Sequence, residues 1–200
     1  MIEVSEKFLT FGKNVFVKEV AIPIGEVIEG IAKEHPCADD VDLRISPRLT
    51  AFTSGLDALI GICLFLGGWA ATKFLDEIYD IKLRPKIKEY FWPYIEKHGP
   101  DKKYSLAILA KKREAVGAVL ICCIGSSIEE IESSERQIPA ALNMAKELLN
   151  SSTENSVYLY VIENGTANLE PKVFENHEMA LEGLKKMYPA KLPKHIKPRG

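Results

Sequence analysis

The sequence lacks the features that would assign it at once to several classes of protein. Its formal net charge is −2 over 200 residues, which gives no general attraction to nucleic acid or to an anionic surface. The first residues, MIEVSEKFLTF, have neither the basic region nor the apolar core of a secretion signal. We therefore expect a cytoplasmic protein that binds no nucleic acid.

Motifs that bind phosphates or metals are also missing. Neither G-x-G-x-x-G nor G-x-x-x-x-G-K-[ST] occurs, and we find no internal repeat. The four cysteines form no C-x-x-C pair, and Cys63, Cys122 and Cys123 lie in apolar runs, where cysteine usually behaves as a small hydrophobic residue. This pattern favours a reducing compartment over a disulfide framework. We expect no cofactor and no metal.

Three segments of the sequence are candidate sites of chemistry. Residues 35–40, HPCADD, are the densest set of possible metal ligands, but no second cluster lies at a zinc-site spacing. Cys122 and Cys123 lack the polar, electropositive setting of a reactive thiol. Residues 125–127, GSS, could bind an anion through free N–H groups, but glutamates follow them. We expect Ser126 and Ser127 to cap a helix instead.

The most apolar stretch is ALIGICLFLGGWAAT, residues 58–72, which carries no charge. A helix needs about 20 apolar residues to span a bilayer, and Asp57 and Lys73 bound this run. The pattern predicts a buried helix from about residue 50 to 81, about 45 Å long. The alternative is a membrane-anchored protein with residues 51–72 inserted.

The rest of the N-terminal part is expected to alternate between strands and helices. Val15, Val17 and residues 20–24 indicate strands, residues 25–34 a short helix, and residues 41–45 a half-buried strand. Proline cannot continue a regular helix, so a second helix is expected only after Pro85. We expect that helix to end near His98 and to kink or shorten at Pro93.

The C-terminal half shows clearer patterns. Residues 104–110 and 116–124 predict a hairpin with a charged tip, whose second strand is central in the sheet. Ser134 and Gln137 match a capping box before a helix that reaches Leu149. Strands are expected at 157–162 and 173–174, separated by the Asn164-Gly165 turn. Asn176 should cap a last helix that contains Met187.

The predicted fold is therefore α+β. A long central apolar helix is combined with a C-terminal half in the order β-β-α-β-(β)-α, whose helices cover a small mixed sheet. Residues 1–98 form an N-terminal region, residues 101–188 a C-terminal region, and residues 189–200 a basic, proline-rich tail. The two regions can pack as one domain.

Two sets of residues are candidates for contacts with partners. An acidic helical face could dock a basic protein, although a solvated face is its usual explanation; its members are Glu129, Glu130, Glu132 and Glu135. A long helix that is apolar all round indicates a homo-oligomer. The interface residues expected on it are Leu59, Ile62, Leu64, Leu66 and Trp69.

These observations favour a non-enzymatic protein that acts by binding another protein. An inhibitor of the immunity type, which neutralises a bacterial toxin, fits the size and charge, although no motif selects it. A membrane-anchored accessory protein is the second hypothesis. The third is a small enzyme with an unrecognised site near Cys37 or Gly125.

Overall fold

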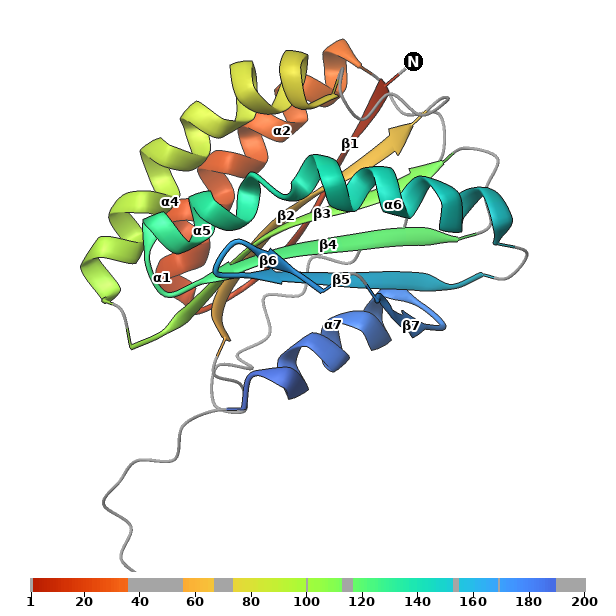
Figure 1. The fold of residues 1–200 in the computed structure, drawn as a ribbon. Helices are drawn as coiled ribbons and strands as arrows, with labels where there is room; N and C mark the ends of the chain where they lie inside the picture. The colour runs from red at the N-terminus through yellow and green to blue at the C-terminus, as the bar shows by residue number, and fades with distance from the viewer. Residues whose placement is uncertain are drawn as a thin grey trace, which may run out of the picture.

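A mixed β-sheet forms the centre of the molecule in the computed structural model (Figure 1). The model describes residues 2–35, 56–66, 74–99, 101–112, 117–152, 155–168 and 170–189. The strands are β1 (Ile2–Phe11), β2 (Leu56–Leu66), β3 (Lys103–Lys112), β4 (Ala118–Gly125), β5 (Val157–Glu163), β6 (Thr166–Ala167) and β7 (Lys172–Phe174). They lie in the order β1-β2-β3-β4-β5-β6, and β7 also pairs with β5. The β2–β3 and β4–β5 pairs are parallel, and the others are antiparallel.

Helical segments make the two parallel crossovers, one between β2 and β3 and one between β4 and β5. The helices are α1 (Asn14–Phe16), η1 (Val17–Ala21), α2 (Ile22–Glu34), η2 (Phe74–Leu83), α4 (Arg84–His98), α5 (Ile128–Glu135), α6 (Ile138–Ser151) and α7 (His177–Met187). Here η1 and η2 are π-helical stretches that run directly into α2 and α4. None of the helices in the described ranges is both long and apolar enough to cross a membrane. The predicted α+β class is confirmed.

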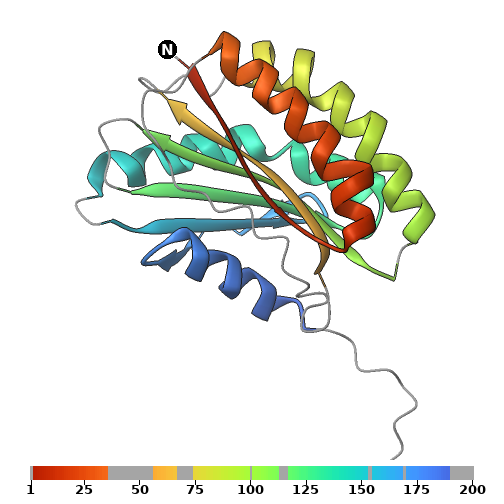
Figure 2. The same ribbon diagram turned by 180° about the vertical axis from the view of Figure 1, so that it is seen from behind.

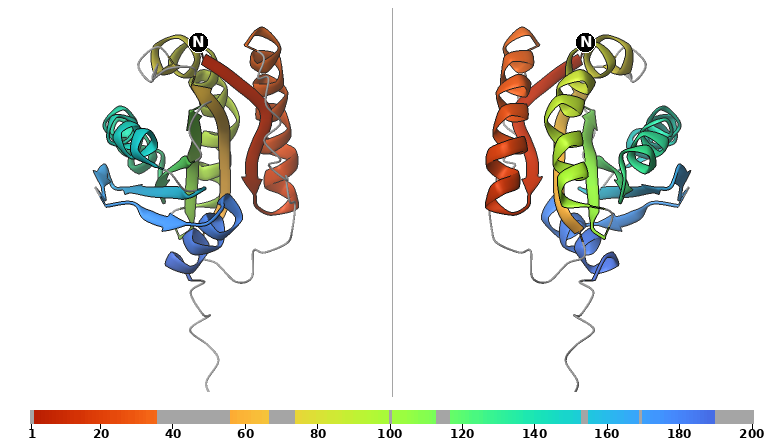
Figure 3. Two further views of the ribbon diagram at one scale, coloured as in Figure 1. Left: turned by 90° about the vertical axis from the view of Figure 1, so that its right-hand side faces the viewer. Right: turned by 90° about the vertical axis from the view of Figure 1, so that its left-hand side faces the viewer.

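The helices divide unequally between the two faces of the sheet (Figures 2 and 3). The larger core lies between one face and the helices α1–α2, η2–α4, α5 and α6, with Ile60, Ile108 and Ile121 among its strand residues. The smaller core lies on the other face, where α7 packs on residues such as Leu109 and Leu120. The sheet is strongly twisted (Figure 3).

The expected long central helix is wrong over residues 56–66, which form strand β2. This strand lies between β1 and β3 and is covered on both faces, so its neighbours Leu59 and Ile60 are both buried. A strand of this kind shows no alternation and cannot be told from a buried helix by its pattern. The insertion of residues 51–72 as a membrane helix is contradicted in the same segment, and residues 51–55 and 67–72 lie outside the described ranges.

The strands expected over residues 15–24 are also wrong, because this segment is helical. Phe16, Val20, Ile24 and Ile28 follow one another at every fourth position and are all buried, which is the apolar stripe of a helix. The helix expected over 25–34 is confirmed as the later part of α2. Strand β1 had no counterpart in the predictions, and the strand expected at 41–45 lies outside the described residues.

Prolines stand in the first turns of two helices and do not separate them from the helical segments before them. Pro23 lies at the start of α2 after η1, and Pro85 at the start of α4 after η2. A proline ring clashes with the carbonyl four residues earlier in a regular helix. A wider π-type turn changes that spacing, so the helix continues past Pro85, where a break was expected.

The C-terminal predictions are largely confirmed. Strands β3 and β4 form the expected hairpin, and α6, β5, β7 and α7 lie where they were predicted. Asn164 and Gly165 have φ angles of 53° and 71°, as a type I′ turn requires. The Asn176 side chain caps α7 by accepting a hydrogen bond from Met179 N at 2.9 Å.

The caps before α6 differ from the prediction. Ser127 caps α5 as expected, because its hydroxyl accepts a hydrogen bond from Glu130 N at 3.3 Å. Ser134, however, lies inside α5, and its hydroxyl accepts a hydrogen bond from Gly165 N at 3.3 Å. Gln137 is the N-cap of α6 without a side-chain bond. Ser134 therefore ties α5 to the turn after β5.

Candidate functional site

Strands β6 and β7 follow one another along the outer edge of β5 and act as a single outer strand. Thr166 lies opposite Glu163 at one end, and Lys172 lies opposite Leu159 at the other. Between these pairs β5 contributes only residues 160–161, whereas the segment from β6 to β7 has more positions, of which Asn168, Glu170 and Pro171 are described. The outer strand therefore bulges away from β5, and bulges of this kind often lie beside functional sites.

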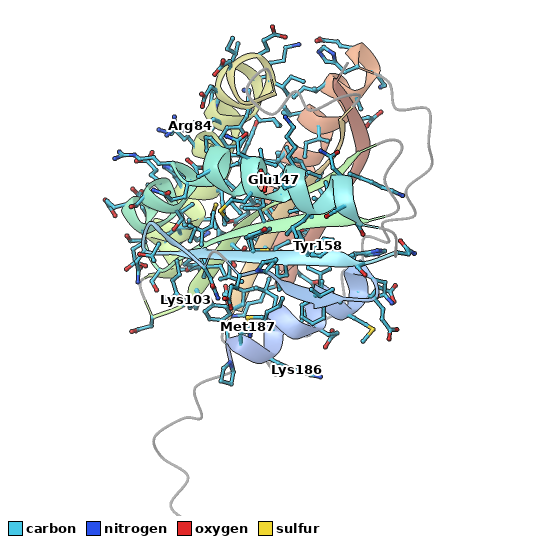
Figure 4. All side chains as sticks on the ribbon, turned by 45° about the vertical axis from the view of Figure 1, so that its right-hand side comes forward. Arg84, Lys103, Glu147, Tyr158, Lys186 and Met187 are labelled. Carbon is cyan, nitrogen blue, oxygen red and sulfur yellow. The ribbon has the colours of Figure 1, made fainter. Side chains whose placement is uncertain are left out.

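A pocket of about 510 Å³ lies at this bulge. Its lining residues are Leu159, Val161, Glu163, Thr166, Ala167, Asn168, Glu170, Lys172 and Met187. Leu159, Val161 and Glu163 alternate along β5 and therefore point to one face of the sheet, the face on which α7 lies. Met187 at the end of α7 lies on this side of β5, whereas Glu147 of α6 lies on the other (Figure 4). The pocket thus has an apolar floor and a polar rim.

Three side chains form a braced group at one end of the pocket. The Lys103 ammonium lies 2.7 Å from Glu163 Oε1, and the Tyr188 hydroxyl donates a hydrogen bond to Glu163 Oε2 at 3.0 Å. Burial, together with the neighbouring Glu163 carboxylate, raises the pKa of Tyr188 well above its usual value. Both carboxylate oxygens of Glu163 are therefore held in fixed positions.

The charges on the opposite side of the pocket are not held in this way. Glu170 and Lys172 are both exposed, and no ion pair involves either side chain within the described ranges. The Glu170 backbone N–H donates a hydrogen bond to Asn168 Oδ1 at 3.2 Å, which shapes the bulge. Within the described residues, the Glu170 carboxylate and the Lys172 ammonium on the rim are thus not held by another side chain.

The four predicted acidic residues do not form one open face. Glu129 is exposed on the first turn of α5, whereas Glu130 turns back to accept a hydrogen bond from Ser126 N at 2.6 Å. Glu132 pairs with Lys88 of α4 at 2.8 Å. These interactions neutralise or redirect much of the acidic surface that was expected to dock a basic protein.

Glu135, the fourth of these residues, is buried with 6% of its surface exposed. The Tyr79 hydroxyl donates a hydrogen bond to Glu135 Oε1 at 2.5 Å, and Arg84 Nε lies 3.4 Å from Oε2. Burial raises the pKa of Glu135, although the Tyr79 hydrogen bond and the Arg84 charge act in the opposite direction. Glu135 therefore connects α5 to η2 and α4 inside the fold.

The residues expected at an oligomer interface belong to the interior of the sheet where they are described. Leu59 and Ile62 are 0% and 3% exposed. Leu64 and Leu66 lie in β2, but their side chains are outside the description, as is Trp69. Of the possible metal ligands in residues 35–40, only His35 is described. The described part of the chain contains no group of three or more His, Cys, Asp or Glu side chains able to hold a metal ion.

Cys122 and Cys123 are buried on opposite faces of β4. Burial raises the pKa of Cys122 to about 12 and that of Cys123 well above its usual value. We therefore predict that neither thiol reacts with iodoacetamide at pH 7.5 in the native protein, and that both react in urea. Peptide mass spectrometry over a time course measures this, and rapid native labelling of either residue contradicts it.

Comparisons with protein-family models, with curated proteins and with solved structures found no match.

Proposed function

We propose that the protein acts by binding another protein and that the pocket beside the outer strand receives a side chain of that partner. The observation that carries this proposal is the apolar floor of Leu159, Val161 and Met187 within a polar and charged rim. Interfaces between proteins have the same anatomy, with an apolar centre, a polar rim and a few anchor side chains that fill pockets.

The groups at the pocket suit recognition better than catalysis. A general acid or base works best when its pKa lies near the working pH, but the pKa of Tyr188 is raised well above its usual value. Glu163 accepts hydrogen bonds on both oxygens from Lys103 and Tyr188. These contacts favour a fixed binding surface over a site that transfers protons.

The partner is expected to be a different protein. Self-association was inferred from a long apolar helix, and that segment contains the central strand β2, with Leu59 buried inside the sheet. The argument for a homo-oligomer therefore loses its basis. Among partner-binding proteins, an inhibitor that neutralises a bacterial toxin remains the example that fits the chain's size and near-zero charge.

A pair of phenylalanine substitutions tests the proposal. Thr166 is exposed and lies opposite Glu163 on the pocket side, so Thr166→Phe should fill the pocket. Val173 is 59% exposed and lies opposite Tyr158, which faces the other side of the sheet, so Val173→Phe is the matched control. Both changes suit an exposed strand, and thermal melts should verify folding.

We predict that the wild type and Val173→Phe capture the same partner from a lysate of the source cells. Thr166→Phe should capture it at least about tenfold less, because a blocked anchor pocket costs about 1.4 kcal/mol or more. Calorimetry with the purified partner provides the dissociation constants. Equal binding by the two variants would place the interface elsewhere and remove the support for this proposal.

A further inference from the structure

The two faces of the sheet are covered to different depths. In the described ranges several helices close the core on one face, whereas α7 is the only helix in the core on the other face. Only Ala180 and Leu184 of α7 are fully buried, whereas α2, α4 and α6 each bury five residues. Because the hydrophobic contribution grows with the apolar area removed from water, α7 is held to the sheet less firmly than these helices are.

The braced group of Tyr188, Glu163 and Lys103 fixes one end of α7. Tyr188 directly follows the helix and donates a hydrogen bond to Glu163 Oε2 of β5 at 3.0 Å. Lys103 of β3 lies 2.7 Å from the other oxygen of this carboxylate. Hydrogen bonds to a charged group stabilise more than neutral ones do. The Tyr188 contact is therefore a substantial part of what holds this end of the helix.

The other end of α7 is joined to the sheet through β7. This strand pairs with β5 over Lys172–Phe174, and residues 175–176 lead from it into the helix. Both parallel crossovers are made by segments that precede α7 in the chain. The helix can therefore swing away from the sheet about residues 175–176 without breaking any pairing between β1, β2, β3, β4 and β5.

We infer that α7 opens from the sheet as a unit while the rest of the fold stays intact, and that the bond from Tyr188 to Glu163 sets how often it opens. Met187 at the end of α7 lines the pocket, so this wall of the pocket moves with the helix. The inference goes beyond the proposed function and holds whatever the pocket binds.

The adjacent cysteines report on the two faces separately. Cys122 belongs to the core that α7 closes, and Cys123 belongs to the larger core on the opposite face. Both thiols are buried, so each reacts only when the structure that covers it opens. Different parts of a protein open with different free energies. Opening of α7 should expose Cys122 and leave Cys123 covered.

Slow labelling of the native, full-length chain measures these openings. N-ethylmaleimide at pH 7.5 reacts with thiols much faster than iodoacetamide does, so it detects rarer openings. Fragment-ion mass spectrometry gives the initial rate at each cysteine, which is divided by the rate at the same residue in the urea-unfolded chain. We expect the corrected rate of Cys122 to exceed that of Cys123 at least about tenfold. It should also depend less on added urea, because opening α7 exposes less surface than global unfolding does.

Two conservative variants separate local from global opening. Tyr188→Phe removes the hydrogen bond to Glu163 and keeps the ring, so it should raise the Cys122 rate at least about fivefold. Phe91→Leu weakens the larger core, on the face that α7 does not cover. It should therefore raise the Cys123 rate and leave the Cys122 rate within about twofold of the wild type.

Two results would overturn the inference. Equal corrected rates at Cys122 and Cys123 with the same urea dependence, or acceleration of both thiols by Phe91→Leu, would mean that the fold opens only as a whole. A Cys122 rate that Tyr188→Phe leaves unchanged would mean that the bond to Glu163 does not control the opening of α7.

Discussion

Replacing Phe91 by alanine should lower the free energy of unfolding by about 4 kcal/mol, because a large buried ring leaves a cavity that the core cannot close. Phe91 is 0% exposed, and its ring centre lies 5.8 Å from that of Phe16 and 6.1 Å from that of Tyr104. The ring therefore joins the N-terminal helix, α4 and the start of β3. Urea unfolding followed by circular dichroism measures the loss.

Glu96 on the same helix provides the control. Its side chain is exposed, so Glu96→Ala should change stability by no more than about 0.5 kcal/mol. Phe91→Leu keeps most of the apolar volume and should cost about half as much as Phe91→Ala or less. A loss below about 1 kcal/mol for Phe91→Ala would contradict the packing of α4 on the sheet.

Replacing Glu135 by alanine should cost about 3 kcal/mol at neutral pH, because it removes a buried carboxylate that both Tyr79 and Arg84 contact. The hydroxyl of Tyr79 would lose this acceptor, and Arg84 would keep only the more exposed Asp80 as a counter-charge. We place the cost at the lower end of the range for buried pairs because the Arg84 side chain is 33% exposed. Urea unfolding measures this loss as a lower midpoint, with an unchanged dependence of the free energy of unfolding on urea concentration. An unchanged midpoint would contradict the buried contact of Glu135 with Tyr79 and Arg84.

The same carboxyl group predicts a dependence of stability on pH. Burial raises the pKa of Glu135 in the folded protein, so the folded state binds this proton more tightly than the unfolded chain does. The folded state therefore loses stability as the pH rises from the ordinary carboxyl pKa through the raised one. Glu135→Gln does not titrate, so the stability of the wild type relative to this variant should fall with pH in that window. Tyr79→Phe removes a bond that lowers the pKa and should move the window to higher pH.

The sequence predicted the C-terminal half well because its signals are local. The Asn164-Gly165 turn, the Asn176 cap and the spacing of Ile138, Ala141, Leu142 and Ala145 each depend on residues close together in the chain. The structure places them as expected, with both turn residues at positive φ. Elements of this kind can be predicted from a short stretch of sequence, without knowledge of distant contacts.

The N-terminal half could not be predicted in the same way, because its secondary structure depends on pairing with strands that are distant in the sequence. Residues 56–66 form a strand only because β1 and β3 flank them, and their composition fits a buried helix equally well. The helical segment from Phe16 to Ile28 did carry a signal, the repeat of apolar residues at every fourth position. The β-branched residues and Pro23 outweighed that signal, although Pro23 is well placed in the first turn of α2.

The candidate site could not be predicted from the sequence either, because it also depends on contacts between distant residues. Glu135 belonged to a run of glutamates, and its burial depends on Tyr79, which lies 56 residues away. The pocket depends on the bulge between Ala167 and Lys172, which is a matter of register between strands. Glu163, Glu170 and Lys172 look like ordinary surface charges until that register is known.

The position of β1 in the chain has a consequence for synthesis on the ribosome. This strand is made before its partner β2, which follows only after α2, and the strand that flanks β2 follows only after α4. Until β2 has been synthesised, the backbone N–H and C=O groups of β1 are unpaired and can bond to other nascent chains. The register shift between Val4 and Phe8 interrupts its hydrogen-bonding pattern, and such interruptions discourage pairing with foreign strands. In the folded protein β1 lies at the end of the described strand order, so this irregularity discourages edge-to-edge pairing with other molecules.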